Sequence, residues 1–346
     1  MKKLLFIIQL ILVTVTTGQD LTSLNNLILK YQKSELFKNS LWAIHAKYLE
    51  SGKIIVDQNS SISIAPASNM KLFTSSAALN ILGEDHEFVT RIYYDGKIDK
   101  QGTLDGNVYL VGGGDPTLGY DLVESSLPLD ALMESWVQAF NRIGIKKIIV
   151  NVFAYDLLYD EKTIPDNWYW IDIGNYYGTG ANALTINNNL YFLYFKPSSK
   201  VGGQAEVVRT NPIVEGLEFT NHMKTGKKGS GDNGYIYCAP LQFNATLRGT
   251  IPAGVDEFSI KGSIPDPPLF AVQELKSTLS ESGIHIEGTT QKLKNKISYD
   301  HNKLIIETYS PPLKDIVYIV NKRSDNLYTE LLFKAIGLAV EGSGTI

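Results

Sequence analysis

The sequence contains almost no cysteine, and several other features that define common protein classes are also missing. Cys238 is the single cysteine among 346 residues, which excludes an intramolecular disulfide and any metal site built from several thiolates. Basic charge is not in excess, because 32 lysines and arginines accompany 36 acidic residues, whereas nucleic-acid binders carry a clustered basic surface. The five histidines lack metal-ligand spacing, and the glycine-rich stretch 112–116 lacks the Lys-Ser/Thr of a phosphate-binding loop. We therefore expect no nucleic-acid partner, no metal and no cofactor.

Long hydrophobic runs are also missing, since the longest apolar stretch, 4–13, is too short to span a bilayer. It follows Lys2 and Lys3 and leads into Thr16-Thr17-Gly18, an arrangement typical of a secretory signal peptide. A buried N-terminal strand or helix is the alternative, but it does not account for the charged start and the small-residue exit together. The sequence predicts a signal peptide over 1–18, export to the periplasm of a Gram-negative cell, and no transmembrane anchor after cleavage.

What remains is the profile of a globular protein, with 44% apolar and 20% charged residues. The length exceeds one comfortable core, so more than one domain is expected. Apolar spacing and end signals predict helices over 21–36, 68–82, 129–143, 269–283, 313–321 and 324–340. Alternation predicts strands over 41–49, 54–56, 88–94, 107–111, 147–153, 190–196, 205–210, 234–239, 258–261 and 303–310. The order indicates a helical-plus-sheet domain that is split in sequence by a β-rich insert.

A candidate nucleophile lies at the start of the helix expected over 68–82. Ser68 and Lys71 are three residues apart, so the hydroxyl and the amine share a helix face. A serine becomes a good nucleophile when a neighbouring base takes its proton, and a lysine held neutral by burial can be that base. The alternative is that Ser68 only caps the helix, a common role for serine. No other Ser-x-x-Lys pair occurs in the chain.

A second candidate, Ser324-Asp325-Asn326, precedes the last expected helix. A hydroxyl and a carboxamide two residues apart at a turn can relay a proton and hold a peptide group. The alternative is again capping, with Ser324 as N-cap and Asp325 complementing the helix dipole. Ser-x-Asn also occurs at 23–25, so this motif is weak in isolation.

Together the two motifs resemble the penicillin-recognising serine enzymes, whose signature is Ser-x-x-Lys, Ser-Asp-Asn and Lys-Thr-Gly. The long interval between Lys71 and Ser324 is similar to that of the D-alanyl-D-alanine carboxypeptidases related to penicillin-binding protein 4, the DacB-like peptidases. Four stretches carry this resemblance, which covers nearly all of the chain after the signal: 67–74, 108–116, 262–268 and, most specifically, 321–330.

The resemblance implies an α+β fold: a β-lactamase/transpeptidase-like domain over 20–88 and 269–346, with an antiparallel sheet flanked by helices. A large β-rich insert of one or two subdomains would fill 89–268. It implies a serine-type D-Ala-D-Ala carboxypeptidase and DD-endopeptidase that acts on peptidoglycan stem peptides through an acyl-enzyme, with β-lactams as covalent inhibitors. Ser68 would be the nucleophile, Lys71 the general base, Ser324 a proton relay and Asn326 the ligand of the substrate amide. A non-catalytic peptidoglycan-binding protein of the same fold and a β-lactamase are the alternatives.

Three features depart from the family pattern or match it loosely. Lys224-Thr225-Gly226 spells the third motif but precedes Ser324, so we interpret it as coincidence. The chain stops directly after the last helix, so we expect a C-terminally incomplete fragment whose true Lys-Thr-Gly lies beyond Ile346. Asp156 aligns loosely with an insert-domain acid that in relatives contacts a substrate amino group, although a solvated loop acid is an equal reading.

Overall fold

The computed structural model describes residues 24–298, 300 and 303–345. The chain divides into a unit that ends at Ala67 and a second unit that begins at Ser68. The signal peptide expected over 1–18 lies outside the described residues. Within the described ranges, no helix has both the length and the apolar character needed to cross a bilayer.

The first unit contains a helix over 24–32 and a two-stranded antiparallel hairpin. Strand β1 (Ile44–Lys47) pairs with β2 (Ile54–Gln58), and Ala46 lies opposite Val56. The helix and hairpin expected for this part of the sequence are therefore confirmed.

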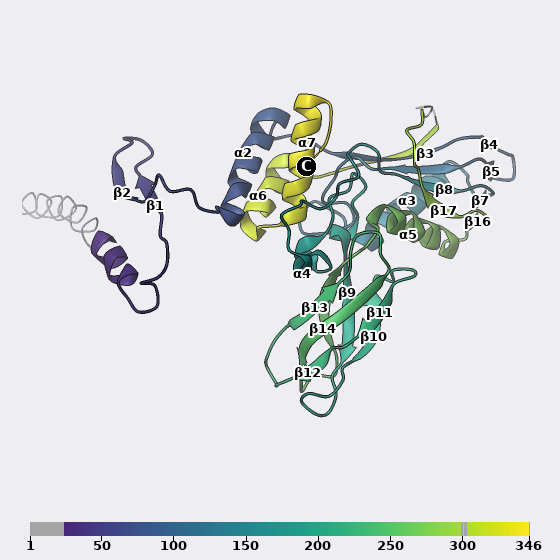
Figure 1. Cartoon of the computed structure of the whole chain (residues 1–346). Helices are drawn as coiled ribbons and strands as arrows, with labels where there is room; N and C mark the ends of the chain where they lie inside the picture. The colour runs from purple at the N-terminus through teal and green to yellow at the C-terminus, as the bar shows by residue number, and fades with distance from the viewer. Residues whose placement is uncertain (1–23, 299, 301–302, 346) are drawn as a thin grey trace, which may run out of the picture. The chain divides into compact units, whose positions relative to one another are not determined.

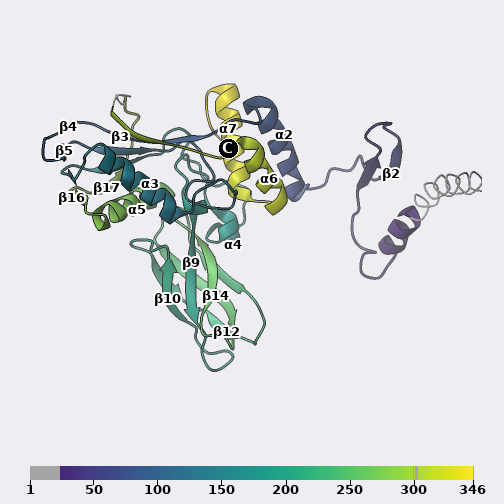
Figure 2. The same ribbon diagram turned by 180° about the vertical axis from the view of Figure 1, so that it is seen from behind.

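In the second unit, three helices pack together around one apolar cluster. They are α2 (Met70–Leu82), α6 (Leu313–Arg323) and α7 (Asn326–Glu341). Figures 1 and 2 show them side by side, although α2 is separated from the other two by more than 200 residues. Helix α2 ends where expected, because the backbone N–H of Gly83, at φ 92°, bonds to the Leu79 carbonyl.

Beside this helical cluster lies a mixed five-stranded sheet. Its spatial order is β17 (Thr290–Lys292), β8 (Val152–Tyr155), β6 (Val108–Val111), β3 (Val89–Tyr94) and β18 (Leu304–Tyr309). Strand β3 is antiparallel to both of its neighbours, whereas β6, β8 and β17 run parallel. A four-stranded sheet has the order β16 (His285–Ile286), β7 (Lys147–Ile148), β5 (Thr103–Asp105) and β4 (Lys97–Ile98). Strands β16, β7 and β5 run parallel, and β4 is antiparallel to β5.

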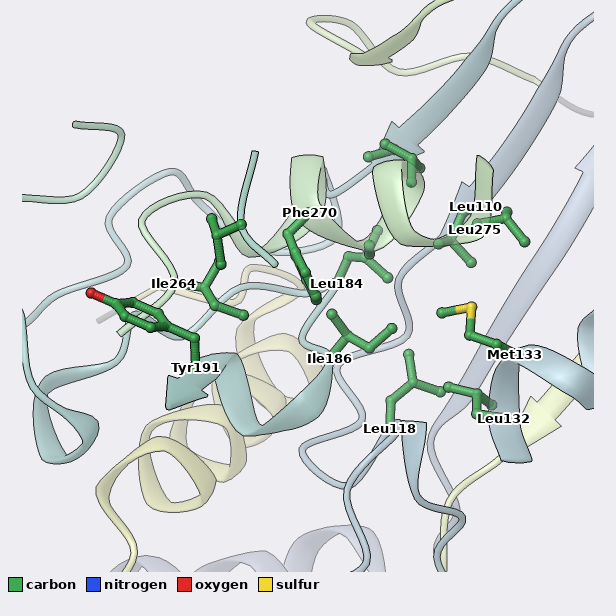
Figure 3. Packing of buried hydrophobic residues seen from close by; sticks show 14 of the residues in the cluster. Leu110, Leu118, Leu132, Met133, Leu184, Ile186, Tyr191, Ile264, Phe270 and Leu275 are labelled. Atoms are coloured by element: carbon green, nitrogen blue, oxygen red, sulfur yellow. The ribbon is translucent and has the colours of Figure 1, made fainter. Parts of the chain in front are cut away.

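Helices α3 (Leu129–Arg142) and α5 (Pro267–Glu281) share the main apolar core with these sheets. Apolar residues of α3 recur at helical spacing, and the Trp136 indole also donates a hydrogen bond to Thr308 of β18 at 2.9 Å. Figure 3 shows side chains of α3 and α5 converging on Ile186 in this core. The core therefore joins early, middle and late parts of the sequence.

The rest of the second unit is a β-rich lobe that extends away from the helices (Figure 1). One sheet has the order β10 (Glu206–Asn211), β9 (Leu190–Lys196) and β15 (Phe258–Ser263). The other is built on β14 (Asn244–Pro252), which pairs with β11 (Glu218–Asn221), β12 (Lys224–Gly226) and β13 (Asn233–Tyr237).

The expected helices from Ser68 onward are all confirmed, but one expected strand is wrong. Residues 147–153 do not form a single strand: β7 ends at Ile148, and β8 begins at Val152 in a different sheet. Between them the backbone turns toward two strands in succession, because Ile149 donates to the Leu104 carbonyl and Asn151 accepts from Val108. A continuous apolar run cannot reveal such a step between sheets.

Candidate active site

The Ser68 hydroxyl lies at the N-terminal end of α2, in a single 3-10 turn (η1, Ala67–Asn69). Helix α2 has no side-chain N-cap, so the capping role considered for Ser68 is not what the structure shows. The Ser68 Oγ instead lies 3.2 Å from the Lys71 Nζ. The three-residue spacing therefore produces the contact that the sequence predicted.

Lys71 is buried, with 9% of its surface exposed, and both of its hydrogen-bond partners are neutral oxygens. The second partner is the Asn326 Oδ1, at 2.6 Å. Burial lowers the pKa of the Lys71 ammonium, and this effect outweighs the nearby negative charges of Asp325 and Glu330, which raise it. A lysine in this state gives up its proton more easily than a solvated one.

Asn326 is the first residue of α7, and both ends of its carboxamide are in use. Its oxygen accepts from Lys71, and its Nδ2 donates to the backbone carbonyl of Tyr177 at 2.8 Å. Tyr177 belongs to a 3-10 turn (η2, Tyr176–Gly178) that follows the short helix α4 (Trp170–Ile173). Asn326 thereby connects α2 to the 3-10 turn that contains Tyr177.

Ser324 lies in the left-handed turn between α6 and α7, at φ 57° and ψ 40°. The N-cap of α7 is Asp325, whose side chain accepts from the Tyr328 N–H at 3.0 Å, so the capping role considered for Ser324 is wrong. Ser324 is exposed, and within the described part of the chain no hydrogen bond joins it to Lys71 or Ser68. The structure thus brings Ser68, Lys71 and Asn326 into contact. Ser324, the fourth expected catalytic residue, lies two residues before Asn326 in the chain and makes no contact with the other three through a hydrogen bond in the described structure.

A further contact at this site was not expected from the sequence. The Ser75 Oγ, which is buried one turn after Lys71, donates to the Asn321 Oδ1 of α6 at 3.0 Å. Helix α2 is therefore tied to the helix that leads into the Ser324 turn. The signal that could have revealed it is the four-residue spacing from Lys71, which places Ser75 on the same face.

Asp156, the candidate for a substrate amino group, uses both carboxylate oxygens within the protein. Its Oδ1 accepts from the Leu184 N–H at 2.7 Å and its Oδ2 from the Asn182 Nδ2 at 2.9 Å. Burial raises the pKa of the Asp156 carboxyl to about 6. Asp156 is thus neither freely solvated nor bonded to the Ser68–Lys71–Asn326 cluster in the described structure.

The Lys224-Thr225-Gly226 copy forms strand β12, at the end of the β-rich lobe far from α2 in both views (Figures 1 and 2). The Lys224 Nζ donates to Gln204 at 2.9 Å, and the buried Thr225 hydroxyl accepts from the Ser198 N–H. Both side chains therefore make their hydrogen bonds within the β-rich lobe.

Over the part of the chain that the structure describes, no group of three or more His, Cys, Asp or Glu residues is arranged to hold a metal ion. A hydroxyl beside a lysine whose ammonium is disfavoured, with a carboxamide fixed next to both, suits nucleophilic acyl transfer.

The comparisons with known proteins agree on one family. The model of the D-Ala-D-Ala carboxypeptidase 3 (S13) family matches residues 24–346. A D-alanyl-D-alanine carboxypeptidase of Actinomadura sp. (strain R39) is 26% identical over 302 residues, which are 85% of this chain and 54% of the relative. The D-alanyl-D-alanine carboxypeptidase DacB of Haemophilus influenzae is 24% identical over 84% of this chain and 58% of the relative.

Among solved structures, penicillin-binding protein 4 of Haemophilus influenzae has the same fold, with a TM-score of 0.72 and 21% identity. The match covers 87% of this chain and 63% of that chain. The expected α+β, transpeptidase-like fold is therefore confirmed. The chain spans little more than half the length of these two curated relatives, but the family match covers nearly all of its own length. The chain belongs to the D-Ala-D-Ala carboxypeptidase 3 (S13) family.

Proposed function

We propose that this chain carries the acylation machinery of a serine-type D-Ala-D-Ala carboxypeptidase, which also opens D-alanyl cross-links as a DD-endopeptidase. The observation that carries the proposal is the contact of the Lys71 Nζ with both the Ser68 Oγ and the Asn326 Oδ1. The substrates are peptidoglycan stem peptides, and β-lactams are covalent inhibitors. The residues at 1–18 export the protein to the periplasm as a signal peptide.

In the proposed reaction, neutral Lys71 takes the proton of the Ser68 hydroxyl while the Oγ attacks the carbonyl carbon between the two terminal D-alanines. The N–H groups at the start of α2 favour the negative charge that develops on the carbonyl oxygen. Ser324 relays the proton that Lys71 took to the departing amine, so that free D-alanine leaves, the acyl group stays on Ser68 and Lys71 is neutral again. Water then attacks the ester and regenerates the hydroxyl.

The domains follow the same proposal: residues 20–88 and 269–346 form the catalytic domain, and 89–268 form the insert. Asn326 holds the substrate amide at the point where these two parts meet, since it bonds to Tyr177 of the insert. Asp156 remains a candidate for a substrate amino group.

The test is covalent labelling of the full-length gene product by a fluorescent penicillin, in the wild type, Ser68→Ala and Ser76→Ala. Ser76 is an exposed serine on the same helix and serves as the matched control. We expect labelling of the wild type and Ser76→Ala and none of Ser68→Ala. A folded wild type that takes no label contradicts the proposal and favours a non-catalytic binding protein. Rapid release of hydrolysed drug indicates a β-lactamase instead.

A further inference from the structure

Three consecutive asparagines directly before β9 have a left-handed backbone. Asn187, Asn188 and Asn189 have φ angles of 52°, 53° and 51°. Residues with a Cβ avoid this region, and asparagine usually enters it as a single residue, so a run of three is costly to keep. Backbone outliers of this kind persist where the surrounding structure holds them, and they gather at functional sites. The contacts of the turn 187–189 should therefore reveal what it positions.

The two outer asparagines hold the turn itself. The Asn187 Nδ2 donates to the Leu190 carbonyl, and the Asn189 Nδ2 donates to the Gly180 carbonyl, both at 2.8 Å. The Asn189 Oδ1 also accepts from the Ile186 N–H at 3.1 Å. These hydrogen bonds to the neighbouring backbone stabilise the left-handed conformation.

The middle asparagine reaches out of the turn. Asn188 is buried, and its side chain forms a hydrogen bond with the Asp325 carboxylate. The amide nitrogen is the donor, because an ionised carboxylate only accepts hydrogen bonds. The Asn188 Oδ1 has no hydrogen-bond partner among the described residues, and a buried acceptor without a partner costs free energy. The turn keeps this cost while it presents the amide N–H groups to Asp325.

Asp325 is the residue through which this contact reaches the candidate active site. Its side chain caps α7 by accepting from the Tyr328 N–H at 3.0 Å, and the next residue, Asn326, bonds to Lys71. Burial raises the pKa of the Asp325 carboxyl, whereas the hydrogen bonds from the Tyr328 N–H and the Asn188 side chain lower it. Asn188 therefore favours the charged carboxylate, which is also the stronger acceptor for the helix N–H.

Three further titratable groups face Asp325, namely Lys71 of α2, Tyr120 and Tyr328 of α7. Burial raises the pKa of both phenols, and the negative charge of Asp325 adds to this effect. Both phenols are therefore neutral at moderate pH. Burial lowers the pKa of Lys71, and the charge of Asp325 opposes that effect. The charge and position of Asp325 thus act directly on the proposed base.

We propose that Asn188 is a positioning residue that holds the Asp325 carboxylate and thereby fixes the start of α7 and the Asn326 carboxamide beside Lys71. Asn188 acts through Asp325, and in the described structure no hydrogen bond joins it to Ser68 or Lys71. The effect on acylation rests on the proposed function, whereas the attachment of α7 through Asp325 is a property of the fold.

The test compares Asn188→Gly with Asn187→Gly in the full-length protein. Glycine adopts the left-handed conformation freely, so each variant keeps the backbone and loses one asparagine side chain of the same turn. In Asn188→Gly, hydrogen exchange of the Tyr328 amide should be about fivefold or more faster, since the cap of α7 is weakened. Carbon-13 NMR should show that the Asp325 carboxyl titrates at a higher pH than in the wild type. Acylation by benzylpenicillin should fall about tenfold. Asn187→Gly should change none of these quantities.

Asn188→Asp carries the same test if the glycine variant does not fold. Aspartate also tolerates the left-handed conformation, but an ionised carboxylate has no N–H to donate. The like charge beside Asp325 should raise the pH at which that carboxyl titrates further still.

Wild-type values of the Asp325 titration and of Tyr328 exchange in a folded Asn188 variant overturn the proposal. So do equal changes in Asn187→Gly, which would show that both side chains only support the turn. Unchanged acylation beside an altered titration would limit Asn188 to the cap of α7 and overturn its role at the site. Absence of penicillin labelling in the wild type would instead contradict the proposed function, and the exchange and titration measurements would still decide on the attachment.

Discussion

Two lysines in this unit are buried to a similar degree, yet their surroundings differ in one respect. Lys71, on α2, bonds only to neutral oxygens, whereas Lys334, on α7, bonds to the carboxylate of Asp160. Burial lowers the pKa of Lys71 because no counterion touches it. The lysine proposed as the base and the lysine that pairs with Asp160 therefore differ more in their hydrogen-bond partners than in their burial.

The carboxylates nearest to Lys71 are kept from pairing with it. Asp325 caps α7 through the Tyr328 N–H. Glu330 raises the pKa of Lys71 through its negative charge, and in the described structure no hydrogen bond joins the two side chains. Burial raises the pKa of both carboxyl groups. The site thus has acids close enough to influence the lysine, but it does not use them as direct partners.

Replacement of Lys71 should have the largest effect on activity. In Lys71→Met, Ser68 loses the group that takes its proton, and acylation by penicillin should fall about 10³-fold. The free energy of unfolding should not decrease, because a buried amine without a counterion gives way to an apolar chain of similar length. Labelling kinetics and urea unfolding measure the two quantities. Near-wild-type labelling would show that Lys71 is not the base.

Lys334→Met should show the opposite pattern to Lys71→Met, with a larger effect on the free energy of unfolding than on acylation. Breaking a buried pair leaves the partner charge partly uncompensated, and we expect a loss of about 3 kcal/mol in the free energy of unfolding. Asp160 keeps some exposure, at 29%, so the loss should lie at the low end for buried pairs. Urea unfolding of Lys334→Met and Lys71→Met side by side is the check. Equal stability of the two variants would show that the Asp160 carboxylate does not make Lys334 more important for stability than Lys71.

The helices and the Ser68–Lys71 pair were predictable because both depend on local spacing. The recurrence of apolar residues every three or four positions, the glycine that ends a helix and the three-residue spacing of Ser68 and Lys71 are all visible within one stretch of sequence. Strand β14, over Asn244–Pro252, was missed because it contains glycine, arginine and proline and lacks clear alternation. It forms because β11, β12 and β13 all pair with it, and these partners lie elsewhere in the chain.

The long-range contacts of the site could not be derived from spacing. Asn326 was assigned by resemblance, and its bond to Lys71 joins residues 255 apart. Lys334 lies between apolar positions of α7, where a lysine normally reaches solvent. Its burial depends on Asp160, 174 residues earlier, so no pattern within the helix indicates it.

The pH dependence of acylation should separate Lys71 from every paired lysine. The neutral fraction of Lys71 falls tenfold for each unit of pH below its lowered pKa, and the acylation rate should fall with it. The unfolded chain has the ordinary pKa of 10.5 and binds more protons than the folded one between the two values, so Lys71 makes stability rise with pH in that window. Lys71→Met should abolish this contribution to the rise. An acylation rate that does not fall as the pH is lowered would contradict the assignment of Lys71 as the base.

The smallest effect should come from replacement of Lys224, the lysine of the Lys-Thr-Gly copy in the β-rich lobe. Lys224→Ala, in the Lys-Thr-Gly copy on β12, removes an exposed bond to Gln204 and should change the free energy of unfolding by about 0.5 kcal/mol or less. Penicillin labelling should remain within about twofold of the wild type, because exposed substitutions away from a site have little effect. Lys322→Ala, an exposed lysine at the end of α6, is a matched control. A marked loss of labelling in Lys224→Ala alone would mean that β12 takes part in the site, and the three side chains on α2 and α7 would then be only part of the acylation machinery.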